Sequence, residues 1–595
     1  MTPVLLLSAI VFLPAVAALG IALIPSDQKD AIRWATLIAT AAVMGLVAAF
    51  LLFPYDPKIS FDAAQAGMQD AFNYAWIPSF RIEYFMGLDG ISFPLVVLTA
   101  FISLLAMGAS WSIEKHVKAY CILFLLLETG MLGVFVALDF FLFYIFWEVM
   151  LLPMYFLIGV WGGPRKEYAA IKFFLYTLAG SVLMLIAILM LYFSSDLRGL
   201  TDAQLVASHV IKDTAGLTPE AAEDNANALK EIRESTSPVH TFNIVALQQI
   251  GQHTKQLDAV QWWSFVLLFI GFAIKVPSVP VHTWLPDAHV EAPTPISMIL
   301  AGILLKMGGY GILRICYPIC PAAGYDLSWW VCLLGIVSMV YGALAAMAQT
   351  DFKRLVAYSS VSHMGYVVLG MGVWSATAGN EFNSYYWDMG VKGAMFQMIA
   401  HGISSAGMFF MVGIIYDRVH HRNLNEFGGL FGKMPVYTAM AIILFFAGLG
   451  LPGLCGFIGE VFVVLSVWKF KYWMAVVAAA VVILTAGYIL WAVQRVYLGP
   501  EYKGPHGDHL TPSNFRENLI GATLCVFAVI FGIFPYQLPG GQPSVLRLMD
   551  ETIDKQVSDL ATWTKANRAA GTPASAPAMP ASPTTPASAP AATEL

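Results

Sequence analysis

The most unusual feature of this sequence is a set of charged side chains inside long apolar runs. Lys275 directly follows the run Trp262–Ile274, which holds no other charged residue. Glu148 and Lys306 lie in two further apolar runs. A charged side chain at the centre of a bilayer costs roughly 2.5–3.5 kcal/mol on insertion scales, so it is kept only where it has a partner, water or a use. We interpret these residues as groups that move charge.

An ammonium and a carboxylate of this kind could form a proton switch. Glu148 lies near the middle of its run and is a candidate anionic partner for Lys275. Burial lowers the pKa of a lysine and a nearby carboxylate raises it, so a carboxylate that approaches and retreats would load and release a proton. Two simpler interpretations stay open: a protonated Glu148 bonded to a backbone carbonyl, and a static ion pair at Lys306.

Two histidines and a second glutamate extend the candidate set. His401 and His363 both lie in predicted membrane spans, and imidazole titrates near pH 6.5 and can relay protons. Glu460 precedes the basic end of its span at Lys469, which places it about 13 Å inside the helix end. There it could load and release a proton at the end of a relay. Each of the three could instead be a core side chain with satisfied hydrogen bonds.

Other polar residues in the spans have weaker claims to chemistry. Glu128 lies in mid-span and could also take part, whereas four residues near span ends are expected at the membrane interface: Asp139, Asp287, His289 and Glu291. The six cysteines form no CxxC pair, and we interpret them as small buried hydrophobic residues. The sequence offers no ligand set for a metal, haem or iron–sulfur cluster, so no cofactor is expected in this chain.

The elements that position these residues must be membrane helices. Of the 595 residues, 58% are hydrophobic and 12% are charged, whereas soluble domains carry about 25% charged residues. Apolar runs of about 20 residues, the length of a bilayer-spanning helix, recur along nearly the whole sequence. We therefore predict an all-α polytopic membrane protein with about 14 transmembrane helices in the lipid bilayer. There is no basic stripe, which argues against nucleic acid as a partner.

Lysine and arginine are distributed unevenly between the two sides of the predicted bundle. Connections after odd-numbered spans hold more of them, for example Arg165 with Lys166 and Lys353 with Arg354, than short connections after even-numbered spans. Because positively charged loops stay in the cytoplasm, the odd-numbered connections are predicted to be cytoplasmic. With an even number of spans, both termini then lie on the outer face.

Two spans are interrupted by helix-breaking residues. The seventh breaks at Pro277 and Pro280 beside Lys275, and the twelfth breaks at Gly450–Gly453 ahead of Glu460. The two spans are five apart and therefore run in opposite directions. Paired broken helices are typical of inverted repeats with an ion site at the repeat interface. We predict two inverted five-helix repeats, each with a broken helix.

These features divide the sequence into five parts. They are N-terminal transmembrane helices at 1–116, a first repeat at 117–316 with a polar insertion at 196–258, a second repeat at 317–500, a C-terminal transmembrane helix at 501–540, and a polar tail at 541–595. The end of the tail, residues 565–595, is almost all Ala, Pro, Ser and Thr and is expected to be disordered.

Three sequence stretches carry a family resemblance. They are Gly-Leu-Asp-Gly-Ile-Ser at 87–92, Pro-Val-His-Thr-Trp-Leu-Pro-Asp-Ala-His at 280–289, and the Gln-Thr-Asp-Phe-Lys-Arg stretch that continues to Gly365. Through them the chain resembles the antiporter-like membrane subunits of proton-pumping NADH:quinone oxidoreductase, respiratory complex I. The likeness covers roughly residues 85–500. A glutamate at position 460 resembles the M type of these subunits, because its sister subunits carry lysine there.

The resemblance implies a role for most of the candidate residues. Glu148 and Lys275 would be the coupling pair, Lys306 a central relay, His401 a further relay and Glu460 the outlet group. His363, which follows Ser359 by one helical turn, is a candidate relay as well.

The resemblance also implies a setting for the chain. It would translocate protons as a subunit of an H⁺-translocating NADH:quinone reductase in a bacterial inner membrane, with both termini in the periplasm. It would carry no redox centre itself: FMN, the iron–sulfur clusters and the quinone would belong to partner subunits. The sister antiporter-like subunits would lie on either side of it.

Two other functions stay open at this stage. The chain could be a subunit of a multisubunit sodium/proton antiporter or of a membrane-bound hydrogenase; a wetter, carboxylate-rich site would favour that, whereas the alternating Glu, Lys, Lys, His and Glu favour protons. It could also be a structural subunit that only supports assembly. The 196–258 insertion, the Ala/Pro-rich tail and Glu128 depart from what the resemblance covers.

Overall fold

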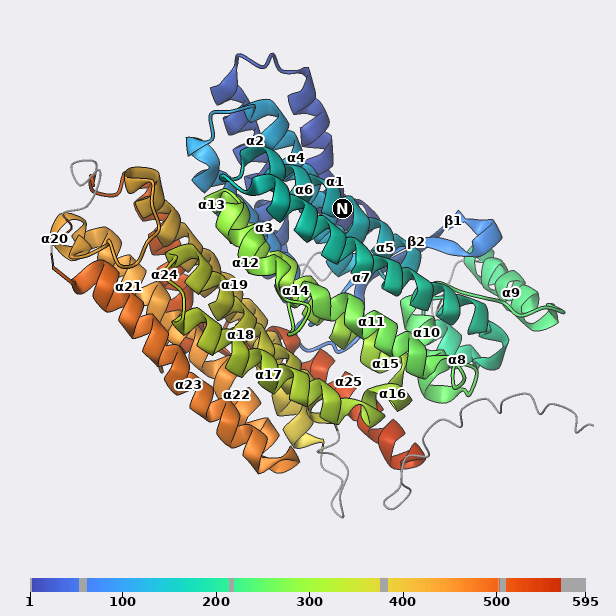
Figure 1. Ribbon diagram of the computed structural model, residues 1–595. Coiled ribbons are helices and arrows are strands. Elements are labelled where there is room, and N and C mark those ends of the chain that lie inside the picture. The colour runs from blue at the N-terminus through green and yellow to red at the C-terminus, as the bar shows by residue number, and fades with distance from the viewer. Residues whose placement is uncertain are drawn as a thin grey trace, which may run out of the picture.

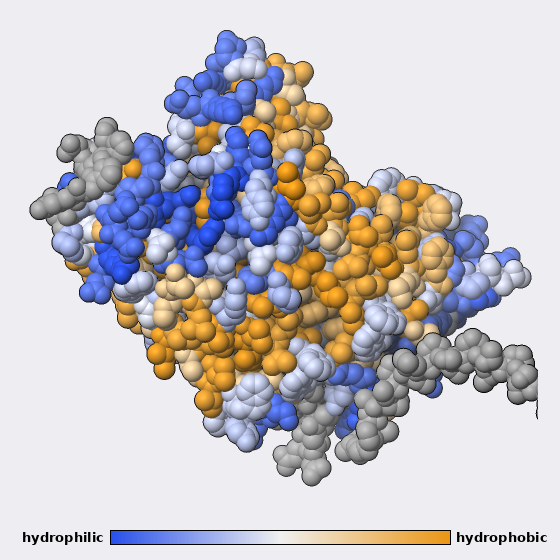
Figure 2. Space-filling view, in the orientation of Figure 1, coloured by the Kyte–Doolittle hydropathy of each residue, from blue (hydrophilic) through white to orange (hydrophobic). Residues whose placement is uncertain are grey.

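The computed structural model describes residues 3–52, 61–212, 219–374, 384–500, 502 and 510–568. In this part of the chain, 11 helical segments are long and apolar enough to cross a membrane, and two further apolar helices are shorter. Figure 2 shows an apolar band between polar surfaces at the two ends of the helices. The predicted all-α polytopic architecture is confirmed, whereas the number of 14 spans stays a prediction. Of the tail expected to be disordered, residues 565–567 belong to a helix that ends at Asn567, and the residues from 569 onward lie outside the described part of the chain.

The N-terminal part is a group of helices with one hairpin. The helices are α1 (Pro3–Leu23), α2 (Lys29–Leu52), α3 (Ser92–Ala109) and α4 (Val117–Val136), and strands β1 (Gln69–Ile77) and β2 (Ile82–Leu88) form an antiparallel pair with Asn73 opposite Phe85. Asp89 follows β2 and accepts hydrogen bonds from the backbone N–H groups of Ile91 (3.0 Å) and Ser92 (2.9 Å). These bonds join the hairpin to the start of α3.

The next span is interrupted close to Glu148. It consists of α5 (Phe140–Val149) and α6 (Leu151–Trp161), and α7 (Lys166–Ser194) follows. Pro153 has no N–H to bond to the carbonyl of Val149, which favours a break at this place. At the other end of α5, the Asp139 carboxylate accepts hydrogen bonds from the N–H groups of Phe141 and Leu142, both at 2.9 Å. Asp139 is therefore a buried helix cap.

The polar insertion folds into short helices at the end of the bundle that carries the hairpin (Figure 1). They are α8 (Asp202–Ala207), α9 (Pro219–Glu234) and α10 (Ile244–His253). The amphipathic helix α25 (Val545–Asn567) packs against α3, α16 (Pro321–Asp326) and α19 (Tyr385–Val419). It lies in the region where the sequence predicted only a polar tail.

Both predicted helix breaks are confirmed. In the first broken span, α11 (Gln261–Lys275) is followed by a loop and then by α12 (Trp284–Glu291). In the second, α21 (Pro435–Leu449) is followed by a loop and then by α22 (Cys455–Phe470). Gly450 ends α21 with φ +77°, a left-handed conformation that favours glycine. The inverted relation between the two halves stays a prediction.

Two long buried helices form the centre of the molecule. One consists of α13 (Thr294–Ile299), a π-helical segment η4 (Leu300–Leu304), α14 (Leu305–Gly311), a second π-helical segment η5 (Ile312–Cys316) and α15 (Tyr317–Ile319); the other is α19. Around them lie α17 (Ser328–Met347), α18 (Phe352–Gly372), α20 (Leu430–Lys433), α23 (Tyr472–Val493) and α24 (Phe515–Ile533). Lys306 lies between the two π segments, a kind of helix distortion that is frequent at functional sites.

Candidate functional site

Lys275 and Glu148 lie near each other without forming an ion pair. Lys275 is the last residue of α11 and only 2% exposed. Its ammonium nitrogen lies 5.2 Å from the ring centroid of Trp147 and 5.5 Å from that of Phe173. Aromatic ring faces attract a cation. Glu148 directly follows Trp147 in the sequence, and its Oε1 is buried without a hydrogen-bond partner.

Lys306 and His401 are in direct contact, although 95 positions separate them in the sequence. The Lys306 ammonium nitrogen lies 2.7 Å from His401 Nδ1, and it also donates to the carbonyl oxygen of Ala301. Ala301 lies in the π segment η4, five residues before Lys306. The π segment thus presents a backbone acceptor to the lysine, while α19 presents the histidine.

His363 and Glu460 continue this line of contacts. The ring centroids of His401 and His363 are 5.8 Å apart, and His363 Nδ1 lies 3.0 Å from Glu460 Oε1. Both members of the His363–Glu460 pair are buried, with side chains 3% and 4% exposed. Four of the six predicted site residues, from α14, α19, α18 and α22, therefore lie in one line, in which the Nε2 atoms of the two histidines have no hydrogen-bond partner among the described residues.

The broken helix also shapes the place of Glu460. Glycine at position 450 lets the loop pass directly over the Glu460 carboxylate, because a Cβ at this position would collide with Glu460 Oε2. The break in the twelfth span is thus a structural requirement of the buried carboxylate as well as a consequence of the helix-breaking sequence.

Lys275 and Lys306 lie on two helices, α11 and α14, that pack against each other. A Cβ on Gly308 would lie only 2.6 Å from the Phe272 carbonyl oxygen and 2.9 Å from the Val276 nitrogen. Glycine therefore lets the two helices pack closely between Lys275 and Lys306. No hydrogen bond or ion pair joins the two lysines within the described residues, so a proton passing between them needs bridging water.

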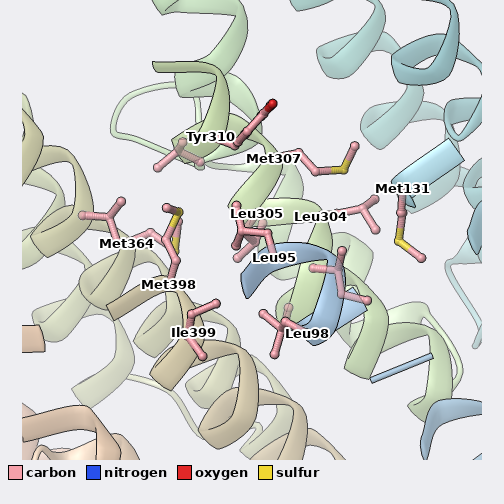
Figure 3. Close-up of a cluster of buried hydrophobic side chains, with 14 of the residues drawn as sticks. Leu95, Leu98, Met131, Leu304, Leu305, Met307, Tyr310, Met364, Met398 and Ile399 are labelled. Carbon is pink, nitrogen blue, oxygen red and sulfur yellow. The ribbon is translucent and has the colours of Figure 1, made fainter. Parts of the chain in front are cut away.

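Apolar side chains surround the part of this line around Leu304–Tyr310, whereas the Gln397 side chain lies 3.5 Å from His363 Nδ1. Figure 3 shows side chains from α3, α4, α18 and α19 gathered around the Leu304–Tyr310 segment. The labelled residues include Leu95, Leu98, Met131, Met364, Met398 and Ile399. The segment that carries Lys306 is thus packed among apolar side chains, where charge interactions are much stronger than in water.

Sequence reasoning placed several polar residues wrongly or missed them. His289 and Glu291 were expected at the interface, but both are buried, at 0% and 5% exposed, in the short helix α12, which packs against α7 and α18. His289 stacks on Phe409 with ring centroids 4.2 Å apart, and both of its ring nitrogens lack a hydrogen-bond partner. Asp287 forms ion pairs with Lys172 (2.8 Å) and Arg354 (3.2 Å).

Glu128 and the pair Asp89–Arg314 are the other buried charged groups of note. Glu128 is 0% exposed, and both of its carboxylate oxygens lack a hydrogen-bond partner. Arg314, which the sequence places near the end of a span, is buried and forms an ion pair with Asp89. An arginine eight residues after Lys306 in the same span was the available signal for this pair. Among the described residues, no group of three or more His, Cys, Asp or Glu could hold a metal ion.

The chain is similar to known proteins over most of its length. The family pattern described as NADH:quinone oxidoreductase/Mrp antiporter, TM, matches residues 137–217 and 235–485, and that of NADH-ubiquinone oxidoreductase chain 4, amino terminus, matches residues 68–138. NADH-quinone oxidoreductase subunit M of Rhodobacter capsulatus is 39% identical over 544 residues, which is 89% of this chain and 93% of that protein. NAD(P)H-quinone oxidoreductase chain 4 1 of a Nostoc species is 34% identical over 93% of this chain and 91% of its own length.

Solved structures show the same fold. A chain of respiratory complex I from Thermus thermophilus with bound NADH superposes with a TM-score of 0.72 at 26% identity, covering 93% of this chain and 99% of that chain. A chain of the Mrp complex from a Dietzia species superposes with a TM-score of 0.70 at 20% identity, covering 94% and 99%, and this likeness shows the fold alone. With matches over most of its length, the chain belongs to the NADH:quinone oxidoreductase/Mrp antiporter family of multi-pass membrane proteins.

Proposed function

We propose that this chain is a proton-translocating membrane subunit of an NADH:quinone oxidoreductase, respiratory complex I. The single observation that carries the proposal is the buried line Lys306–His401–His363–Glu460. Relatives named as subunit M or chain 4 of such oxidoreductases, at 34–39% identity over about nine-tenths of this chain, support it. The chain is thus part of an enzyme whose redox chemistry takes place elsewhere.

The chemistry of the line is proton transfer between nitrogen and oxygen atoms. The Lys306 ammonium donates a proton to His401 Nδ1, and the imidazole releases a proton from Nε2 on the other side of its ring. His363 accepts that proton, through water where the rings do not touch, and passes it from Nδ1 to the Glu460 carboxylate. Glu460 then holds the proton as a neutral carboxyl group beside the loop at Gly450 until it is released.

The coupling pair acts before this line. When Glu148 approaches Lys275, the ammonium form is stabilised; when it withdraws, the proton is released toward Lys306. The structure has the two side chains apart, with Lys275 between the rings of Trp147 and Phe173. Moving one charge against the membrane potential requires about 2.3 kcal/mol per 100 mV. A carboxylate that comes and goes in a medium of low dielectric constant can supply an energy of this size.

The setting of the subunit follows from the same proposal. Sister antiporter-like subunits lie on either side of it, and FMN, the iron–sulfur clusters and the quinone are held by other subunits. The membrane is the bacterial inner membrane. The Lys- and Arg-rich connections face the cytoplasm, so both termini, the hairpin and the insertion face the periplasm.

The test is a Lys306→Met variant of the whole complex, reconstituted in vesicles. We expect fewer protons pumped per NADH oxidised, since Met fills the space of Lys without a titratable group. Lys115→Met is the matched control, because Lys115 is exposed near one end of the bundle. Normal proton pumping by the Lys306→Met complex would overturn the proposal. Uptake of ²²Na⁺ by the wild-type complex in place of proton transport would favour the antiporter function instead.

A further inference from the structure

A large cavity opens at the end of the molecule that carries the hairpin and the insertion. Its volume is about 910 Å³, and its walls come from β1, β2, α8, α9, α10, α25 and the end of the segment that begins at α13. Polar side chains line it, among them Glu83, His209, Gln248 and Gln556. The relay described above does not use this cavity.

The floor of the cavity is the buried ion pair of Asp89 and Arg314. Their side chains are 2% and 4% exposed, and both residues line the cavity. The Arg314 Nε is buried and has no hydrogen-bond partner. A buried N–H beside a polar cavity is a site for an ordered water molecule. The cavity thus brings a hydrated region down to a paired charge inside the protein.

A short path leads from this floor to Lys306. Lys306, Tyr310 and Arg314 follow one another at intervals of four residues, one helical turn each, over about 12 Å. The Arg314 guanidinium lies 5.6 Å from the ring centroid of Tyr310, whose hydroxyl donates to the Phe135 carbonyl oxygen at 3.2 Å. Tyr310 is fully buried and is the one polar side chain between the two cations on this face of the segment.

We propose that the cavity is a second aqueous mouth through which protons leave Lys306 on the face that bears the insertion. The inference rests on the proposed function. In the step, an N–H bond of the Lys306 ammonium breaks, the proton passes to water beside Tyr310, and it leaves as hydronium through the cavity. Lys306 is then a neutral amine that can accept the next proton. Asp89 cancels the charge of Arg314, which would otherwise repel a proton at this place.

Apolar side chains close the path in the structure. Met131 and Met307 lie with Leu304 in the cluster that includes Tyr310 (Figure 3). Methionine side chains are flexible and tolerate rearrangement, so this layer can open for water without unfolding a helix. Outside the spans, burial raises the pKa of Glu83 on the cavity wall. That carboxylate can therefore take up a proton closer to neutral pH than an exposed one.

The experiment places a fixed charge in the cavity. Gln249→Cys and Gln556→Cys introduce a thiol on two walls, from α10 and α25, and Ser558→Cys on α25 is the matched control because Ser558 is exposed outside the cavity. The six native cysteines of the chain are buried and free. The purified complex is treated with a cationic or an anionic methanethiosulfonate reagent of similar size, then reconstituted, and protons pumped per NADH oxidised are measured.

We expect the cationic adduct at either cavity position to lower the proton-to-electron ratio, and the anionic adduct and both Ser558→Cys adducts to leave it unchanged. Complete labelling by the cationic reagent without a lowered ratio at either position would overturn the inference, as would an equal loss with both reagents. The Lys306→Met result decides the proposed function separately. If that variant loses pumping while the cavity adducts do nothing, the second mouth is wrong and the relay stands.

Discussion

The two ends of the candidate relay differ in how their charged groups are held. At one end, the Lys275 ammonium lies over the rings of Trp147 and Phe173 and forms no ion pair with Glu148 among the described residues. At the other end, two histidines lie between Lys306 and Glu460, with a Lys306–His401 distance of 2.7 Å, a His363–Glu460 distance of 3.0 Å and a distance of 5.8 Å between the two ring centroids. A charged side chain without a fixed partner can change its partner, whereas side chains that lie in one line can pass a proton from one to the next. Under the proposed function, we therefore expect control at the Lys275 end and conduction at the Glu460 end.

The largest effect on proton pumping is expected when the Glu148 carboxylate is removed. Glu148→Gln keeps the size of the side chain and removes its charge, so Lys275 loses the group that switches it. We expect proton transfer through this subunit to fall about 100-fold, the scale of a lost acid–base group. Proton pumping in reconstituted vesicles measures it, with the exposed residue Glu114→Gln as the control. Pumping equal to that of the control would show that Glu148 is not the switch.

A smaller loss is expected at the conducting end. Glu460→Gln removes the final acceptor, but His363 stays in place and can pass its proton to water. We expect a fall of about tenfold in pumping, corresponding to about 1.4 kcal/mol of barrier. His363→Gln in the same background should then remove most of what is left, since both acceptors are gone. If Glu460→Gln were as damaging as Glu148→Gln, the two ends would not differ in the way described here.

A substitution at Gly450 tests whether the close packing of the loop against Glu460 is required. Gly450→Ala forces a side chain into a left-handed conformation and toward the Glu460 carboxylate. Backbone strain of this kind costs about 1–3 kcal/mol, so both thermal stability and pumping should decrease. Gly432→Ala is the control, because a Cβ there meets nothing within 4 Å. A thermal-shift assay of the complex measures the first effect, and unchanged Tm and pumping would contradict the packing around Gly450.

The smallest effect is expected from the aromatic contact of Lys275. Trp147→Leu keeps an apolar side chain but removes the ring face, whose attraction for a cation amounts to about 0.5–2 kcal/mol. We expect pumping to fall about fivefold, well short of the Glu148→Gln effect. A loss as large as that of Glu148→Gln, in a complex that still oxidises NADH, would mean that the ring and not the carboxylate holds the lysine.

The candidate site residues and the helix breaks could be predicted from the sequence because both depend on local chemistry. Charges in apolar runs identified Glu148, Lys275, Lys306 and Glu460, and Pro277 predicted that α11 ends at Lys275. Glycine at position 450 likewise predicted the break before α22.

Contacts between distant segments could not be predicted in this way. Nothing local says that His401 meets Lys306 or that His363 meets Glu460, since helix packing decides both. Helix α12 packs against α7 and α18, so a position near a span end did not mean an exposed residue, and the burial of His289 was not predicted. Helix α25 had a signal that was missed: apolar residues recur every three or four positions at Leu546, Met549, Ile553, Val557 and Leu560.

The proposed function requires water between Lys275, the lysine of the proton switch, and Lys306, where the line of titratable groups begins. A cryo-electron microscopy map of the whole complex, at a resolution that shows ordered water, tests it most directly. We predict water molecules that bridge the Lys275 and Lys306 ammonium groups across the crossing of α11 and α14. A gap filled only by packed apolar side chains, in a preparation that pumps protons at its full rate, would contradict the account.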